Sequence, residues 1–316
     1  MKILITCVGR RVELVQEFYR SAKQLGIDLK ICGTDADLTA PALAFCDEKV
    51  LAPKIRSDEY IPFMLDYCKK EKVDGLIPTI DTDLLVFAEN KDKFSAIGVK
   101  VFVAKEDKVK VCRDKRLTSN YFNSLGLSSP CTVDSVVNYS GGFPAFIKPK
   151  DGSSSINAFK VENEEQLKAY SERVKDYIVQ PFVSGTEYTV DVFCDYDGNP
   201  IYITPRVRLA VRAGEVLKTK ISNEPSIIEE VKKLVSDFAP SGAITVQLIR
   251  DDKTGVNHYI EINPRFGGGA PLSIKAGADA TTALLKVLQG EKLEYMPNSA
   301  CDGAIFCRFD QSVRVK

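Results

Sequence analysis

Two alternating runs near the C-terminal end of the chain predict a β-hairpin with a polar face. Residues 243–249 and residues 259–263 alternate in polarity, and an Asp-Asp-Lys-Thr-Gly loop lies between them, as in a hairpin connection. If odd-numbered residues face odd-numbered residues, Gln247, Glu261 and Asn263 share one surface. Oxygen ligands of this kind suit a hard divalent cation that also coordinates phosphate.

The register of the hairpin decides what else lies on that surface. We expect Arg250 to pair with Val256 or with His258, which keeps the odd-numbered residues together. Tyr259 then shares the face of Glu261, and His258 lies on the opposite face. This is the only histidine of the chain, and we interpret it as structural. A mechanism must therefore use carboxylates, lysines, arginines and a metal ion.

Arg265 lies two residues beyond Asn263 and would contact a phosphate through two N–H groups. A polar sheet face that ends in an Asn-Pro turn is the simpler explanation for any one of these residues. Only the combination of Gln247, Glu261, Asn263 and Arg265 favours a site for a metal ion and a nucleotide.

The composition excludes several classes of protein. Lys+Arg and Asp+Glu number 43 each, so no net charge favours nucleic acid or a membrane surface. No run approaches the about 20 apolar residues of a membrane span, and the start lacks the pattern of a secretory signal. The nine cysteines include no Cys-x-x-Cys pair, as expected for reduced thiols. We expect a cytoplasmic protein of two or three domains that binds neither nucleic acid nor membranes.

Strands and helices alternate in the N-terminal third, which predicts a Rossmann-like parallel sheet with helices on both faces. The expected strands are residues 3–6, 29–32, 49–52, 75–79 and 99–103, and the expected helices are residues 14–25, 58–70 and 83–94. Gly9 stands alone where a dinucleotide-binding turn needs Gly-x-Gly-x-x-Gly, which disfavours a nicotinamide-dependent oxidoreductase.

The loops at the carboxyl ends of these strands carry candidate substrate ligands. Arg10 or Arg11 would bind a substrate carboxylate, and Asp81 and Asp83 would bind a substrate ammonium group. Solvated surface charges and helix caps are the competing interpretations of these four residues.

The middle of the chain delivers a lysine from a strand into a loop of small residues. Lys148 ends an apolar run and precedes residues 151–155, whose backbone N–H groups would approach phosphate oxygens. A flexible serine-rich turn is the alternative. Farther on, residues 180–183 reach a Ser-Gly hinge, and Glu187 begins a strand where it would accept ribose hydroxyl groups. An ordinary half-exposed strand is again the alternative.

These motifs, taken in order, resemble the ATP-grasp superfamily. They lie between about residues 107 and 290, and the preceding residues look like the sheet domain that precedes the grasp in those enzymes. The pattern is closest to one half of the carbamoyl phosphate synthetase large chain and to single-copy ATP-grasp carboxylate–amine ligases. The motifs that carry the resemblance are Lys115, Lys148-Pro149, the small-residue loop, Gln180-Pro181, Glu187, Gln247 and Glu261-Ile262-Asn263-Pro264-Arg265.

The resemblance implies roles for the matching residues. The implied ATP-binding residues are Lys115, Lys148, Ser153, Ser154, Ser155, Gln180, Pro181, Phe182, Val183 and Glu187. The implied ligands of Mg²⁺ or Mn²⁺ are Gln247, Glu261 and Asn263. The candidate catalytic residues are Arg265, Lys218 and Arg212. The candidate substrate-binding residues are Arg10, Arg11, Asp81, Asp83, Gly267, Gly268 and Gly269.

Three features depart from the family pattern. The chain carries one set of motifs, whereas a carbamoyl phosphate synthetase large chain carries two. The phosphate loop is rich in serine rather than glycine. The segment with Arg206, Arg208, Arg212 and Lys218 is unusually basic, and it would clamp phosphate and an acidic substrate or form ordinary surface charge. The roles of Arg206, Arg208 and Lys275 are left open.

We predict an α/β protein of three parts: a parallel-sheet domain at residues 1–106, a small lid subdomain at residues 107–183 and a C-terminal subdomain at residues 184–316 of an α+β ATP-grasp fold. The expected activity joins a small-molecule carboxylate to an amine through an acyl phosphate, with ATP converted to ADP. The alternatives are a carbamoyl phosphate synthetase-like chain that acts on bicarbonate or carbamate with a partner subunit, and a non-catalytic nucleotide-binding module. A homodimer is compatible with either enzyme.

Overall fold

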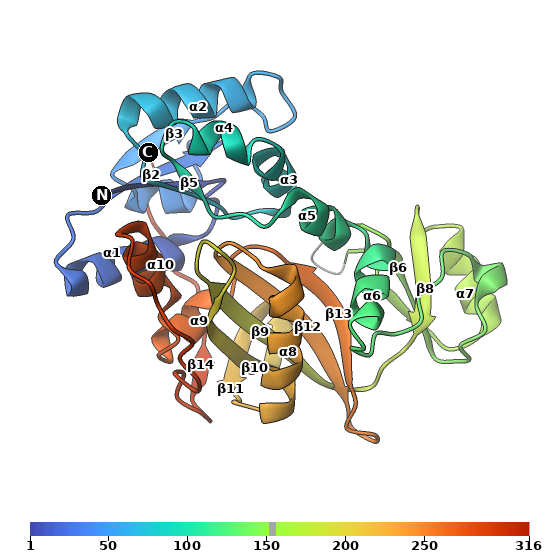
Figure 1. Ribbon diagram of the computed structural model, residues 1–316. Helices are drawn as coiled ribbons and strands as arrows, with labels where there is room; N and C mark the ends of the chain where they lie inside the picture. The colour runs from blue at the N-terminus through green and yellow to red at the C-terminus, as the bar shows by residue number, and fades with distance from the viewer. Residues whose placement is uncertain (152–155, 316) are drawn as a thin grey trace.

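The computed structural model describes residues 1–151 and 156–315 and begins with a parallel sheet covered by helices on both faces (Figure 1). Its strand order is β3-β2-β1-β4-β5. The strands are β1 (Lys2–Thr6), β2 (Lys30–Asp35), β3 (Glu48–Leu51), β4 (Gly75–Pro78) and β5 (Lys100–Val101). The helices are α1 (Val12–Leu25), the 3-10 turn η1 (Pro41–Phe45), α2 (Tyr60–Glu71), α3 (Asp81–Glu89) and α4 (Lys91–Ser95). The predicted parallel sheet is confirmed.

Alternate residues of β1 enter two different hydrophobic cores. Ile3 and Ile5 pack in a core that includes α1, whereas Leu4 packs in a core that includes α2 and α3. This arrangement follows from the two-residue period of a strand that is buried on both faces. Helix α1 ends at Gly26, whose φ of 67° gives the left-handed cap that glycine tolerates best.

A second, three-stranded sheet forms a small lobe at one side of the molecule (Figure 1). Its antiparallel strand order is β7-β6-β8. The strands are β6 (Ala145–Pro149), β7 (Phe159–Val161) and β8 (Tyr177–Pro181), and they are accompanied by the 3-10 turn η2 (Val136–Asn138) and α7 (Glu164–Ser171). The preceding helices α5 (Glu106–Arg113) and α6 (Lys115–Ser124) pack instead in the larger core that contains α3 and β13. The sheet and α7 enclose a small core that is separate from the two larger ones.

The third sheet has six strands in the order β13-β12-β9-β10-β11-β14. They are β9 (Gly185–Cys194), β10 (Pro200–Arg212), β11 (Glu215–Ile221), β12 (Ala243–Asp251), β13 (Asn257–Asn263) and β14 (Ile305–Cys307). The helices of this part are α8 (Pro225–Phe238), α9 (Ala270–Lys275) and α10 (Ala280–Leu288). Val190 and Val246 pack with α8 on one face, so the alternate residues Thr189 and Gln247 point to the other face. The boundaries of the three predicted parts stay predictions.

The hairpin of β12 and β13 differs in register from the sequence prediction. Arg250 pairs with Asn257, and a β-bulge near Leu248 then brings Gln247 opposite Glu261. The bulge adds one residue to the pairing. Gln247 and Glu261 therefore share one face as predicted, although the pairing of Arg250 differs from the prediction. Two expectations fail for the same reason, because Tyr259 packs in the core with α8 and His258 pairs with Ile249 on the face of Gln247.

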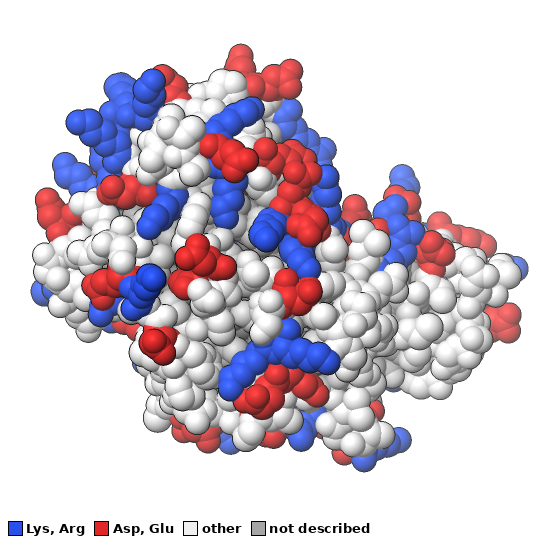
Figure 2. Space-filling model, in the orientation of Figure 1, with Lys and Arg blue, Asp and Glu red and all other residues white. Residues whose placement is uncertain are grey.

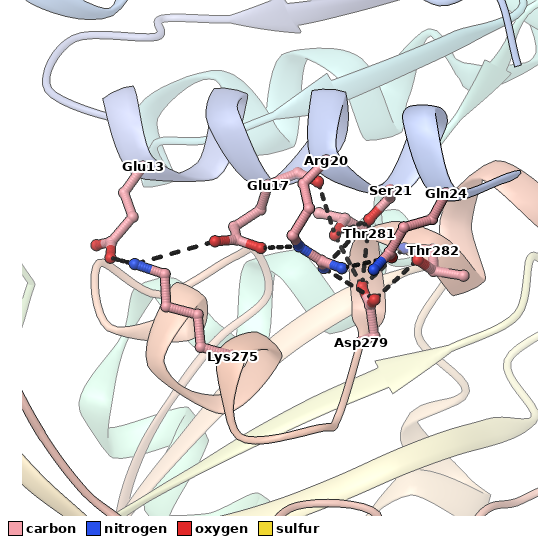
Figure 3. Close-up of polar contacts among 9 residues, drawn as sticks. All are labelled: Glu13, Glu17, Arg20, Ser21, Gln24, Lys275, Asp279, Thr281 and Thr282. Carbon is pink, nitrogen blue, oxygen red and sulfur yellow. Dashed lines mark hydrogen bonds and ion pairs between the residues drawn. The ribbon is translucent and has the colours of Figure 1, made fainter. Parts of the chain in front are cut away.

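Charged and hydroxyl side chains hold α1 against α9 and α10 (Figure 3). Arg20 donates to Glu17 on its own helix and, at 2.8 Å, to Asp279 at the start of α10. Lys275 pairs with Glu13 at 2.5 Å, which identifies a structural contact for a residue whose role the sequence left open. The N-terminal sheet and the six-stranded sheet therefore pack as one unit.

The surface and the thiols agree with the composition. Acidic and basic side chains are interspersed over the face shown in Figure 2. All nine cysteines are free thiols. Within residues 1–151 and 156–315, no helix has the length and apolar character needed to cross a membrane.

Asp83 lies inside the N-terminal domain, which contradicts its predicted role in substrate binding. Its side chain is completely buried in α3, and it accepts a 2.6 Å hydrogen bond from Thr6. Burial raises the pKa of Asp83 to about 7.

We predict that Asp83 makes stability depend on pH. Its folded pKa of about 7 exceeds the unfolded value of 3.8, so the folded state holds an extra proton between these values, and stability falls as pH rises through that window. Asp83→Asn mimics the protonated form and should remove most of this slope, a change on the order of a few kcal/mol. Urea denaturation from pH 4.5 to 8 would measure it.

The matched control is Asp66→Asn on the exposed face of α2, which should keep the wild-type slope. A slope unchanged in Asp83→Asn would contradict the assignment.

Candidate active site

A hydrogen-bonded series of side chains runs from the end of β13 to the N-terminal sheet. Asn263 donates to Glu261 at 3.0 Å and accepts from Arg265 at 3.2 Å. Arg265 in turn donates to both carboxylate oxygens of Asp81, at 3.1 and 2.8 Å. Both oxygens of Asp81 are thus engaged by Arg265, so a substrate ammonium group would share this carboxylate with the guanidinium, and the predicted substrate role of Asp81 stays a prediction.

The residue after Arg265 anchors the same segment to two elements. The ring of Phe266 contacts Phe18 of α1 edge-on and stacks on Phe193 of β9, each with ring centroids 6.2 Å apart. Phe266 is buried, and such aromatic contacts fix the path of the backbone. The glycines that follow are therefore held beside the N-terminal domain.

The predicted metal ligands come together on the open face of the six-stranded sheet. Gln247 lies directly opposite Glu261, and Asn263 lies opposite Thr245. Across the part of the chain that is described, no three His, Cys, Asp or Glu side chains form a metal cluster. One carboxylate with amide oxygens fits a Mg²⁺ ion that takes its other ligands from phosphates and water, as this ion usually does.

Two lysines lie close enough to this carboxylate for their charges to interact, one on the small lobe and one at the start of α6. Strand β6 carries Lys148, which is only 7% exposed, and the start of α6 carries Lys115, whose backbone N–H donates to Lys150 at 3.0 Å. Burial lowers the pKa of both lysines, that of Lys148 to about 8, and the charge of Glu261 opposes this effect in each case. A buried cation such as Lys148 fits a phosphate-binding role, because an anion would offset the cost of its burial.

The predicted adenine and ribose ligands lie along β8 and β9. Gln180 is buried and Pro181 pairs with Ala145. The N–H of Phe182 donates to the carbonyl of Pro144 at 3.0 Å, so this hinge group already has a partner within the protein. Val183 follows at the hinge. Ser153, Ser154 and Ser155 lie outside the described residues.

The basic side chains of β10 and β11 are engaged within the protein. Glu187, the predicted ribose ligand, is half-exposed and forms a 3.0 Å ion pair with Arg208. Arg206 is buried and pairs with Asp191 at 2.8 Å, which makes it part of the sheet interior. Arg212 pairs with Asp310 at 3.1 Å on the surface. Neither this pair nor the exposed Lys218 of β11 is tied by any described contact to Glu261, so their catalytic roles stay predictions.

Gly267 to Gly269 make room for side chains of the protein itself. A Cβ atom on Gly267 would lie 2.8 Å from Thr245 Oγ1, one on Gly268 would lie 2.5 Å from Glu215 Oε2, and one on Gly269 would lie 2.6 Å from Arg206 Nη2. Gly267 and Gly268 also line a cavity, so their predicted substrate-binding role stays a prediction.

This cavity also contains residues that the sequence analysis missed. Arg10 and Arg11 line it as candidate carboxylate ligands, together with Glu215 and Arg308. The last two belong to no motif. The basic character of β10 and β11 had drawn attention to that hairpin, but nothing in the sequence linked Glu215 to Arg308.

Family models match two separate parts of the chain. The model "PylC-like, N-terminal domain" matches residues 3–102, and "ATP-grasp in the biosynthetic pathway with Ter operon" matches residues 173–303. Over the second of these ranges the chain is similar to ATP-grasp proteins. The resemblance inferred from the motifs is thereby confirmed.

Curated relatives of this chain include several ligases. A D-alanine–D-alanine ligase of Francisella tularensis is 33% identical over 40% of this chain and 46% of its own length. A 3-methyl-D-ornithine–L-lysine ligase of Methanosarcina mazei is 24% identical over 72% of this chain and 59% of its own. A carbamoyl-phosphate synthase of Methanobrevibacter smithii is 22% identical over 93% of this chain and 84% of its own. The chain thus spans about half of the first two.

Solved structures share the whole fold. The biotin carboxylase domain of Hydrogenobacter thermophilus 2-oxoglutarate carboxylase, a dimer in complex with MgADP and bicarbonate, gives a TM-score of 0.76 at 18% identity over 96% of this chain and 73% of its own. An L-amino acid ligase of Bacillus licheniformis gives 0.71 at 18% identity over 91% and 74%. The predicted combination of a parallel-sheet domain and an ATP-grasp fold is confirmed.

We predict that ATP binding by this protein weakens above pH 8. The pKa of Lys148 is about 8 because of burial, and only its charged form attracts phosphate, so the affinity should fall by up to about tenfold per pH unit above that value. Lys148→Arg keeps the charge and should flatten the profile. Calorimetric titration with a non-hydrolysable ATP analogue and Mg²⁺ between pH 7 and 9.5 tests this; a flat wild-type profile would count against it.

Proposed function

We propose that this chain is an ATP-dependent carboxylate–amine ligase. It transfers the γ-phosphoryl group of ATP to a substrate carboxylate, releases ADP, and joins the activated acyl group to an amine. The observation that carries the proposal is the series from Glu261 through Asn263 and Arg265 to Asp81, because it joins the metal-binding face to the edge of the N-terminal sheet. A cavity lined by Ile80 and Gly267 opens next to the end of this series. The ligase names of the relatives support the proposal.

The protein's own residues supply positioning and charge. Lys115 and Lys148 hold the phosphates, and Glu187 binds the ribose. Gln247, Glu261 and Asn263 hold Mg²⁺, or Mn²⁺ in its place, which would neutralise phosphate charge when bound. The same groups would accommodate the MgADP seen in the carboxylase neighbour. Phosphoryl transfer depends mainly on such positioning and neutralisation, which a chain with one histidine can provide.

A second function is favoured by one specific match. The carbamoyl-phosphate synthase relative aligns with 93% of this chain, so a chain that acts on bicarbonate or carbamate with a partner subunit is the alternative. A homodimer is proposed on the model of the dimeric neighbour.

We predict that Glu261→Gln abolishes turnover. The change removes the only carboxylate among the proposed metal ligands while it preserves size, so ADP formation should fall by at least about a hundredfold. Binding of Mn²⁺ in the presence of an ATP analogue, followed by electron paramagnetic resonance, should weaken in parallel, and the melting temperature should change little. Wild-type turnover in this variant would exclude the assigned metal site.

Release of ADP tests the activity itself. The protein with MgATP is screened against amino acids, bicarbonate and sugar acids, each with and without candidate amines. We expect release that requires both an organic acid and an amine. Release with bicarbonate alone would favour the carbamoyl phosphate alternative, and nucleotide binding without release under every condition would indicate a non-catalytic module.

A further inference from the structure

The segment from Arg265 to Ser273 lies against a buried ion pair of the six-stranded sheet. Arg206 Nε donates to Asp191 Oδ2 at 2.8 Å, and the two side chains are only 2% and 11% exposed. Asp191 pairs with Thr245 of β12, two residues from Gln247, so the ion pair lies on the sheet face that carries the predicted metal ligands. The segment begins with the candidate catalytic Arg265 and ends in α9.

Two hydroxyl groups attach the ends of this segment to the same sheet face. Ser273 Oγ, in α9, donates to Asp191 Oδ2 at 2.6 Å. Thr245 Oγ1 donates to the backbone carbonyl of Arg265 at 3.3 Å. Both hydroxyl residues are buried, so water competes little with these hydrogen bonds.

Between these two ends, glycines pack directly on the same side chains. A Cβ atom on Gly269 would lie 2.6 Å from Arg206 Nη2, and one on Gly267 would lie 2.8 Å from Thr245 Oγ1 and 3.5 Å from Asp191 Oδ1. The φ of Gly269 is −95°, which any residue adopts, so close approach is the reason for glycine at this position. The ion pair and Thr245 therefore set the path of the segment.

The side chain of Arg265 has its own support on the N-terminal sheet, where it donates to both oxygens of Asp81. Asp81 thus orients the guanidinium, whereas the contacts with Thr245 and the ion pair place the backbone from which that side chain extends. Both supports matter, because a displacement of about 1 Å in a positioned group can lower a rate by about a hundredfold.

We propose that Asp191 and Arg206, together with Ser273 and Thr245, are positioning residues that place Arg265 against the γ-phosphate of ATP. None of the four needs to touch nucleotide or substrate for this role. The inference rests on the proposed function in one respect, the contact of Arg265 with the γ-phosphate, and that contact is measurable without turnover.

The contribution of the γ-phosphate to binding reports the position of Arg265. Calorimetry in the presence of Mg²⁺ measures the affinity for adenylyl imidodiphosphate and the affinity for ADP, and their ratio in each variant is compared with that of the wild type. A general loss of nucleotide affinity leaves this ratio unchanged. Arg265→Lys should lower it at least about threefold, because lysine lacks the planar fork that contacts phosphate through two N–H groups.

Two variants remove the hydroxyl groups singly and leave the ion pair intact. Ser273→Ala and Thr245→Val should each lower the ratio at least about threefold, since each loses one buried hydrogen bond that places the segment. The affinity for ADP should stay within about twofold of the wild type in both. Asp191→Asn should lower the ratio further, but it leaves the charge of Arg206 unpaired, so the hydroxyl variants decide if this one fails to fold.

The matched controls are Thr219→Val and Ser241→Ala. Thr219 is buried in β11 and donates to the carbonyl of Val207 at 2.6 Å. Ser241 is also buried and donates to the carbonyl of Tyr196 at 2.8 Å. Each control loses a buried hydroxyl group of the same kind without touching the segment, so the ratio should stay at the wild-type value. Melting temperatures compare the stability of all variants.

The outcomes separate this proposal from the ligase activity. An unchanged ratio in either hydroxyl variant, or in Arg265→Lys, overturns the positioning role even if ADP is released. Equal losses in the two controls also overturn it, because general destabilisation would then explain the effect. The expected pattern of ratios without ADP release from any mixture upholds the positioning role and rejects the ligase.

Discussion

The ion pair of Arg265 with Asp81 joins the strand that carries the candidate metal ligands to the N-terminal sheet. Its two partners lie 184 positions apart in the chain, and the guanidinium is mostly buried, so loss of the carboxylate would leave a charge without compensation. Arg265 also donates to Asn263, which donates to Glu261. The geometry of the metal site therefore depends on how the two sheets are docked.

Packing supports the same docking from both sides. Each of the two large cores contains residues of the N-terminal sheet and of the six-stranded sheet, and the charged contacts of α1 with α9 and α10 close the rim. The three-stranded sheet has its own small core. Lys148 thus belongs to a separately packed lobe, while Glu261 belongs to the main body. A phosphate group that contacts Lys148 and a metal ion held by Glu261 would therefore depend on the position of the lobe relative to the main body.

Buried charge occurs in two settings. Arg206 and Asp191 pair with each other inside the sheet, although each keeps one buried polar atom without a hydrogen-bond partner among the described residues. Burial lowers the pKa of Lys148 in the small lobe. A buried cation of this kind is unfavourable in the free protein and becomes favourable with an anion. Lys148 therefore marks where the phosphates of the nucleotide are expected to bind.

The sequence by itself determined the local elements and the order of the motifs. Alternation in β1, the glycine stop of α1 and the polar residues of β13 follow from periods of two and 3.6 residues that need no tertiary information. The ATP-grasp fold could be predicted because its motifs recur in a fixed order along the chain.

Tertiary structure alone decided which partners these residues have. The bulge that aligns Gln247 with Glu261 depends on the neighbouring strand β9 and on core packing, and no turn signal announces it. Asp81 was assigned to the substrate because its partner, Arg265, is distant in sequence. Glu215 and Arg308 were missed for the same reason: 93 positions separate them, and only the folded chain brings their charges to one cavity. Local pattern sets which side chains a strand presents, whereas long-range packing sets what those side chains meet.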